Sequence, residues 1–359
     1  MAESKAMRKN LGLDLLRVLL SFGVVLCHFW HVDMHGPHGV WRFFCQLKTA
    51  AVPAFMVMTF LFTCERYRRS DVDWLKRRCM RLWTPFLFWS FVAWCVAKIC
   101  FAISGTHEVG VGDLLLQFAL GANNKVSGQF WFHSNLIMLT FGFFLFFRYV
   151  RRDWMLPVLV LALTVCYLFQ YTELNLLCFG NLRTGVRQPF GRLCATIPFA
   201  CIGLFLAVKR GWLDSLDARM RVALGVAAAW TIWWFIYLNP CPAPAFDFVT
   251  TAGERLPSLG DHGLKLQVLA IAFVVLFYLL PVGRCPGWVV KAAEHVSQFC
   301  MGIYCTHMFL GWVCNEYLFA RIGVKPQTFG SCLLLWGIAW LFCWLFSHLP
   351  GRFFKDVVR

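Results

Sequence analysis

Ten apolar stretches follow one another along this chain, with few charged residues inside them. Each approaches or exceeds the roughly 20 residues that an α-helix needs to cross the hydrocarbon of a bilayer. We expect one membrane-spanning helix in each of the ranges 11–32, 43–64, 82–104, 131–149, 155–172, 193–209, 222–239, 264–283, 298–320 and 330–350. A shorter stretch, 112–122, is typical of a re-entrant or interfacial helix. The sequence therefore predicts an all-α, polytopic integral membrane protein with about ten transmembrane helices.

The composition supports this fold class. The chain is 59% hydrophobic and 14% charged, whereas a soluble domain carries about 25% charged residues. No polar linker or internal repeat separates two halves, so we expect a single membrane domain over residues 1–359. Arg17 interrupts the first apolar stretch, and no small-residue cleavage site follows it. We therefore expect this stretch to remain as a helix rather than to act as a signal peptide.

The positions of Lys and Arg predict the orientation, because cytoplasmic loops are enriched in both. With the N-terminus inside, the inside segments hold 22 of the 34 Lys and Arg residues and the outside segments hold 8. This bias predicts that both termini are cytoplasmic, in a multi-pass protein of the cell (inner or plasma) membrane. The net charge of +16 then reflects side chains near anionic headgroups of membrane lipids. It needs no nucleic-acid partner.

The first predicted helix is the richest in ionisable side chains, which are costly within a membrane and usually functional. Asp14 lies three residues before Arg17, so the two are neighbours on the helix surface. His28 follows Arg17 by eleven residues, which places both on one face about 16 Å apart along the axis. We interpret this face as the lining of a polar passage. The alternatives are an Arg17 that reaches the interface beside Asp14 and a His28 that only bonds a neighbouring helix.

A basic segment precedes the third predicted helix. Arg78 and Arg81 are three residues apart there, on one face of the helix start. Arginine presents a planar fork that suits phosphate, so a phosphorylated cytosolic ligand is one interpretation. The other is that these charges only set the orientation.

A cluster of histidines ends the first apolar stretch. It contains His28, His31, His35 and His38, with Asp33 among them. A metal site is conceivable from these residue types. Gly36 and Pro37 should end the helix before the cluster can share a face, and the chain has no Cys-x-x-Cys pair. We therefore expect no metal.

Five motifs resemble those of one family in the same order. Arg17, ten intervening residues and His28, within DLLRVLLSFGVVLCHFW (14–30), resemble the first-helix signature of the acyltransferase 3 family of integral-membrane O-acyltransferases. The later motifs are VPAFMVMTFLF (52–62) with Thr59 at a usual Ser, KRRCMRLWTPF (76–86) with Arg78 and Arg81, QFWFHSNLI (129–137) with Trp131, and MGIYCTHMFL (301–310) with Tyr304 and His307. Two further residues depart from the family pattern: His133 stands at a usual Leu, and Phe60 stands at a usual Gly, which would alter how closely the helices approach.

The resemblance implies a reaction and roles for these residues. The donor would be cytosolic acyl-CoA, usually acetyl-CoA, and the acceptor a hydroxyl of a glycan or lipid-linked glycan, as in family members that O-acetylate bacterial envelope glycans. Arg78 and Arg81 would hold the donor, and Arg17, beside Asp14, would lie on its passage. His28 would act as a base or as a covalent acyl carrier, and the sequence does not choose between these.

The remaining motif residues have weaker assignments. Thr59, Trp131, Tyr304 and His307 would line the substrate cavity, although Trp131 also suits a membrane-interface belt and His307 also suits helix packing. No extramembrane hydrolase-like domain, which some family members carry, is expected here, so the membrane domain would have to reach the acceptor itself. The alternative function is a transporter or exporter of an anionic or lipid-linked substrate through an Arg- and His-lined cavity. A membrane sensor or scaffold is a third hypothesis.

Overall fold

The computed structural model describes residues 10–30, 40–69, 71–105, 108–121, 126, 128–171, 184–238, 248–249, 255–256, 264–281 and 285–359. These residues are almost entirely helical. The helices in chain order are α1 (Leu11–Phe29), α2 (Val40–Arg68), α3 (Val72–Ser104), α4 (Val111–Leu120), α5 (Trp131–Tyr149), α6 (Arg152–Tyr171), α8 (Thr184–Val208), α9 (Arg210–Ser215), α10 (Ala218–Leu238), α11 (Leu264–Leu279), α12 (Gly287–Ser297), α13 (Cys300–Val313), α14 (Phe329–Phe346) and α15 (Arg352–Asp356). The turn η1 (Gly128–Phe130) precedes α5, and the π-helix η4 (Cys314–Leu318) extends α13. The strands β1 (Phe248–Val249) and β2 (Arg255–Leu256) form one short antiparallel pair.

The helices confirm the predicted all-α class, while the predicted count of ten spans is not confirmed. Each of the ten apolar ranges contains a helix, and the stretch 112–122 contains the ten-residue α4. Within the described residues, six helices are long and apolar enough to cross a membrane: α1, α2, α3, α5 with η1, α10 and α14. The apolar parts of α6, α8 and α11 are shorter than 18 residues, and α13 has 14. The protein is thus a multi-pass membrane protein, while ten spans and cytoplasmic termini remain predictions.

Side-chain caps explain where several helices begin. The Asn10 side chain accepts a hydrogen bond from the Leu13 amide at 3.2 Å, and Asp71 accepts one from the Trp74 amide at 2.8 Å. Thr328 caps α14 by accepting from the Ser331 amide at 3.1 Å. Such caps satisfy backbone N–H groups that have no partner within the first helical turn.

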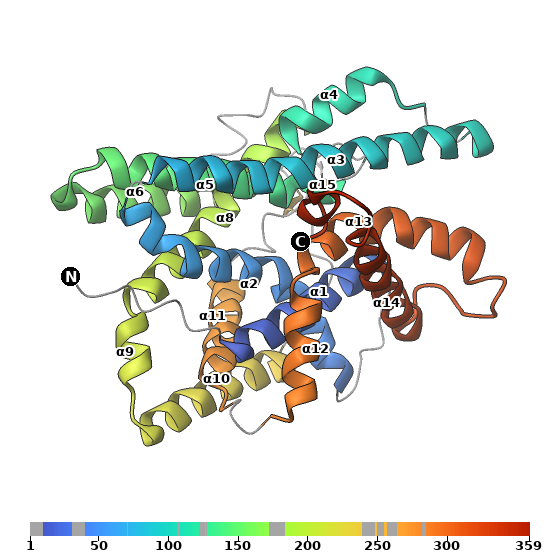
Figure 1. Ribbon diagram of the computed structural model, residues 1–359. Coiled ribbons are helices and arrows are strands. Elements are labelled where there is room, and N and C mark those ends of the chain that lie inside the picture. Colours follow the sequence, from blue (N-terminus) through green and yellow to red (C-terminus); the bar gives the residue numbers. More distant parts are fainter. Residues whose placement is uncertain are drawn as a thin grey trace.

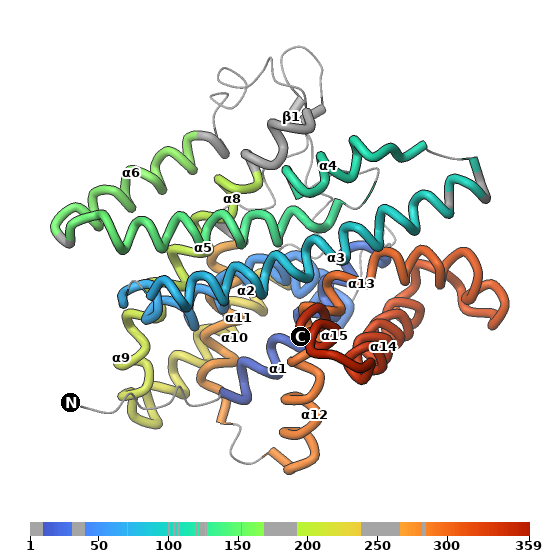
Figure 2. The backbone as a smooth tube through the Cα atoms, turned by 45° about the horizontal axis from the view of Figure 1, so that its top comes forward, coloured from blue at the N-terminus to red at the C-terminus, as the bar shows by residue number. Residues whose placement is uncertain are grey.

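The helix α1 occupies the interior of the fold. It packs against α2, α11, α12, α13 and α14, which lie around it in Figure 1. The helices α3 and α5 run side by side in both Figure 1 and Figure 2, with α4 next to α3. The short helix α15 lies on the surface, against α3.

The outer helices expose large apolar side chains. Trp154 and Leu156 on α6 are 61% and 71% exposed, and Val226 and Trp230 on α10 are 62% and 60% exposed. Soluble proteins rarely expose apolar patches on this scale. These faces fit contact with lipid, in agreement with the membrane class.

The packing of α2 against α8 accommodates the bulky Phe60. Phe60 is fully buried, and the residue opposite is Gly203 on α8. A Cβ atom at Gly203 would lie 2.3 Å from the Val57 carbonyl oxygen and 2.9 Å from the Phe60 Cβ. Phe60 was expected to alter how closely the helices approach. Because Gly203 has no side chain, α8 still packs closely against α2 at this point.

Candidate active site

Two contacts bring α1 and α13 together along their length. The thiol of Cys300 donates to the Arg17 carbonyl at 3.4 Å. At the other end, the Phe29 ring lies over Gly311 so closely that a Cβ there would sit 2.1 Å from the ring. Because both contacts follow the same direction along each helix, α1 and α13 run parallel here. Their facing residues form the site.

A pair of histidines lies between these two contacts. The rings of His28, in the last turn of α1, and His307 on α13 have centroids 5.2 Å apart and planes tilted by 40°. The Phe29 ring meets the edge of His307 at 6.3 Å. His307 is fully buried, whereas His28 is exposed. Two predicted site residues from opposite ends of the chain are thus in contact, and a ligand can reach one of them.

Backbone hydrogen bonds fix the orientation of His307. Its Nδ1 lies 2.7 Å from the Tyr304 carbonyl oxygen and 3.2 Å from that of Ile303. Since both oxygens only accept, Nδ1 carries the hydrogen and Nε2 of the neutral ring carries the lone pair. Within the described structure, this buried Nε2 has no hydrogen-bond partner. A buried polar atom without a partner is rare and calls for an explanation such as a bound ligand.

Tyr304 connects the histidine pair to α5. Its hydroxyl donates to the Gln129 carbonyl in η1. Its ring lies 5.9 Å from His307 and 5.3 Å from both Phe132 and His133, measured between centroids. Tyr304 is 5% exposed, so the sequence-predicted residue is part of the wall of the site.

His133 extends the cluster, although the sequence analysis did not select it as a site residue. It is fully buried on α5, and its Nδ1 has no hydrogen-bond partner in the described part of the chain. Its Nε2 lies 3.9 Å from the Cys305 sulfur, and its ring stacks on Phe86 at 6.4 Å. The charge of Arg78 acts on it. The signal was visible: a histidine stands where the family motif usually has Leu.

Arg192 is a second residue that sequence reasoning missed. Its guanidinium carbon lies 5.5 Å from the centroid of the Trp131 ring, a cation–π contact between α8 and α5. Its Nη1 is buried and lacks a hydrogen-bond partner among the described residues, and its charge acts on Tyr304. Arg192 entered the sequence analysis only as one of the eight Lys and Arg residues in the predicted outside segments.

The predicted donor-binding residues form a separate basic group. Arg17 pairs with Asp14 at 3.0 Å, and its guanidinium lies 5.0 Å from the Phe62 ring centroid. The charges of Arg17 and Arg81 both act on Arg78. Arg81 is exposed, while Nε of the half-buried Arg78 is shielded from solvent and has no hydrogen-bond partner in the described ranges. The first-helix pair and the third-helix arginines thus lie in one electrostatic neighbourhood.

Among the described contacts, none joins Thr59 to the histidine pair or to the arginine group. It is half-buried on α2, and its carbonyl oxygen accepts from the Thr63 hydroxyl at 2.9 Å. His31, Asp33, His35 and His38 lie outside the described residues. Within the described ranges, no three His, Cys, Asp or Glu side chains gather as metal ligands would.

Comparisons with known proteins give one finding. A protein-family model described as an acyltransferase domain matches residues 10–350. The searches of curated proteins and of solved structures returned no significant match.

Proposed function

Since the chain belongs to the acyltransferase 3 family and is a membrane acyltransferase, we propose that it moves an acyl group, most simply acetyl, from acyl-CoA to a hydroxyl of a glycan or lipid-linked glycan. The observation that carries this proposal is the contact between His28 and His307, with ring centroids 5.2 Å apart. An imidazole titrates near neutral pH, which suits proton transfer to and from a hydroxyl.

In the proposed reaction, exposed His28 meets the acceptor. The acceptor hydroxyl oxygen attacks the thioester carbonyl and forms the new C–O bond, while His28 takes the hydroxyl proton. The C–S bond then breaks, and His28 returns the proton to the departing CoA sulfur. A covalent acyl-imidazole on His28 is the alternative route. His307, held by the Tyr304 carbonyl, keeps the lone pair of Nε2 available and orients the ring of His28.

Arg78 and Arg81 are the proposed phosphate ligands for the donor. Arginine binds phosphate through paired hydrogen bonds, and the Arg78 Nε is a donor without a protein partner in the described structure. Arg17 is partly neutralised by Asp14, so we assign it to the passage rather than to the main phosphate contact. His133 lies within the electrostatic reach of Arg78 and in ring contact with Tyr304. It therefore bridges the donor side and the histidine pair.

The acceptor side is proposed to include Trp131 and Arg192. Both lie next to the wall formed by Tyr304: Trp131 contacts Phe132 at 6.4 Å, and Phe132 contacts Tyr304 at 5.3 Å. The buried Nη1 of Arg192 can donate to an acceptor oxygen there.

The test is the release of CoA from acetyl-CoA by the detergent-purified protein, with an envelope-glycan extract as acceptor. Wild type is compared with His28→Ala and His307→Ala, and with His295→Ala as matched control. His295 is a half-buried histidine on α12 that contacts Phe299 and Trp340 instead of the pair.

We expect CoA release that requires the extract and both paired histidines but not His295. Intact acetyl-CoA, despite a folded protein that moves an anionic or lipid-linked substrate across vesicles, would contradict acyl transfer and favour the transporter alternative. A protein that neither binds CoA nor transports would favour the sensor or scaffold.

A further inference from the structure

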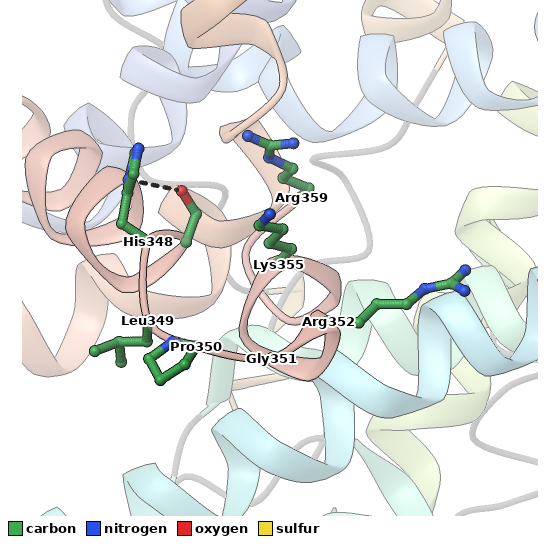
Figure 3. Close-up of a pocket in the computed structure, with 8 residues that line it drawn as sticks. His348, Leu349, Pro350, Gly351, Arg352, Lys355 and Arg359 are labelled. Atoms are coloured by element: carbon green, nitrogen blue, oxygen red, sulfur yellow. Dashed lines mark hydrogen bonds between the residues drawn. The ribbon is translucent and has the colours of Figure 1, made fainter.

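A pocket of about 520 Å³ lies at the C-terminal end of the chain (Figure 3). The turn 347–351 after α14 forms one wall, and Arg352, Lys355 and Arg359 form the rest. None of these residues belongs to the motifs or contacts described above. The volume falls in the range of roughly 300–1,000 Å³ that is usual for small-molecule sites.

The walls of this pocket are anchored in the core. Val357 and Val358 are fully buried. The Trp89 indole on α3 donates to the Val357 carbonyl at 2.7 Å. Gly302 on α13 admits the Val358 carbonyl, since a Cβ at that glycine would lie 2.6 Å from the oxygen. The pocket is therefore held in shape by both α3 and α13.

The lining is basic, and no lining residue is acidic. Figure 3 shows His348 on one side and Lys355 and Arg359 on the other, while Arg352 points away. Arg352 forms an ion pair with Asp356 at 3.5 Å. The His348 Nδ1 lies 2.7 Å from the Trp344 carbonyl, which leaves Nε2 for a ligand. Two cations that have no ion-pair partner among the described residues, together with an imidazole, thus surround one space.

We propose that this pocket binds the phosphate group of a small ligand. Lysine and arginine side chains around a concave site are a common phosphate-binding arrangement. Two sources share the chemistry: the headgroup of an anionic lipid from the surrounding bilayer, and the nucleotide phosphates of the acyl donor. Only the second source rests on the proposed function.

A ligand in the pocket would stabilise the start of α13, the helix that carries Tyr304 and His307. The Arg359 guanidinium lies 5.5 Å from the centroid of the Phe299 ring. The next residue, Cys300, opens α13 and contacts the Arg17 carbonyl. A ligand that holds Arg359 therefore steadies the start of α13, on which Tyr304 and His307 are carried.

The test uses the full chain in nanodiscs of phosphatidylcholine, with or without phosphatidylglycerol. The variants are Lys355→Gln, whose exposed side chain can change without loss of fold, and the double variant Lys355→Gln/Arg359→Gln. The matched control is Arg151→Gln, which removes an exposed cation that pairs with Asp153 at 3.7 Å, away from the pocket. Calorimetric titration measures the affinity for CoA in phosphatidylcholine discs, and native mass spectrometry counts the phosphatidylglycerol molecules that the protein retains.

We expect one of two results from the double variant, with a smaller effect of Lys355→Gln and none of the control. Roughly tenfold weaker CoA binding identifies the nucleotide, and loss of a retained phosphatidylglycerol at unchanged CoA affinity identifies the lipid. Equal affinity and equal retention in wild type and both variants, or no binding of either ligand by wild type, overturns the proposal. Failure of the proposed function appears separately, as no acetyl-CoA turnover by wild type.

Discussion

The arginine group (Arg17, Arg78 and Arg81) and the histidine pair (His28 and His307) differ in charge and lie at opposite ends of the α1–α13 contact. At the arginine group the charges are permanent, and Asp14 and the Phe62 ring compensate the one on Arg17. At the histidine pair the side chains carry no permanent charge, and His307 Nε2 is buried without a hydrogen-bond partner in the described structure. Permanent cations suit the binding of an anionic donor, whereas neutral imidazoles suit the transfer of a proton. The difference predicts that binding and chemistry can be impaired separately.

The largest expected effect is on the histidine pair. His28→Ala should lower kcat by roughly 10²- to 10⁴-fold, the usual contribution of a general base, because the proton acceptor is removed. CoA affinity should stay the same, since the arginine group is intact. Stopped-flow detection of the CoA thiol measures the rate, and titration measures the affinity. Normal turnover by His28→Ala would remove this residue from the mechanism.

The next effect concerns the arginine group. Arg78→Gln should raise the KM for acyl-CoA roughly tenfold, through loss of charge-assisted hydrogen bonds, with a much smaller change in kcat. Steady-state kinetics over a range of acetyl-CoA concentrations measures both constants, and Arg151→Gln is the control. A fall in kcat at constant KM would instead place Arg78 with the chemistry, and the two regions would no longer be distinct.

His133 lies between the arginine group and the histidine pair, so a substitution there tests whether the two regions are coupled. His133→Leu replaces a buried nitrogen that lacks a partner in the described chain with the residue usual in the family motif. The folded state should gain roughly 1–3 kcal/mol, the cost of leaving a buried polar group unsatisfied, so Tm in detergent should rise. Turnover should fall, because the bridge from Arg78 to Tyr304 is lost. A lower Tm together with normal turnover would show that His133 is a packing residue.

The smallest expected effect concerns the cation–π contact between Arg17 and Phe62. Phe62→Leu removes the ring 5.0 Å from the guanidinium, and we expect a loss of about 0.5–1 kcal/mol in stability. Phe62→Tyr keeps the ring and should behave as wild type. Thermal unfolding of the three proteins measures the difference, while kcat should not change. An equal loss in both variants would indicate steric packing rather than attraction between cation and ring.

Contacts within one helix were readable from the sequence. The eleven-residue spacing of Arg17 and His28 fixes their shared face, because helical geometry sets about 100° per residue. Apolar runs predicted where helices form, since backbone groups in lipid must be satisfied within the segment. The motif containing Tyr304 and His307 pointed to the second histidine by resemblance alone.

Contacts between helices were not readable. The approach of His28 to His307 depends on Gly311 yielding space to Phe29, two residues from opposite ends of the chain. The contact of Arg192 with Trp131 likewise joins α8 to α5. Such pairs are set by the detailed packing of small and large side chains, which periodicity does not encode. The ten predicted spans were counted from hydropathy, which marks an apolar range such as 298–320 but does not fix the length of the helix that forms there.

The burial of Val357 and Val358 against α3 and α13 has a consequence for the order of events during synthesis. These residues leave the ribosome after every helix of the site, yet they fill the space beside Gly302, two residues before Tyr304. The first turns of α13 therefore reach their final packing only after the rest of the bundle has been made. The newly inserted protein should remain inactive until Val357 and Val358 dock against α3 and α13.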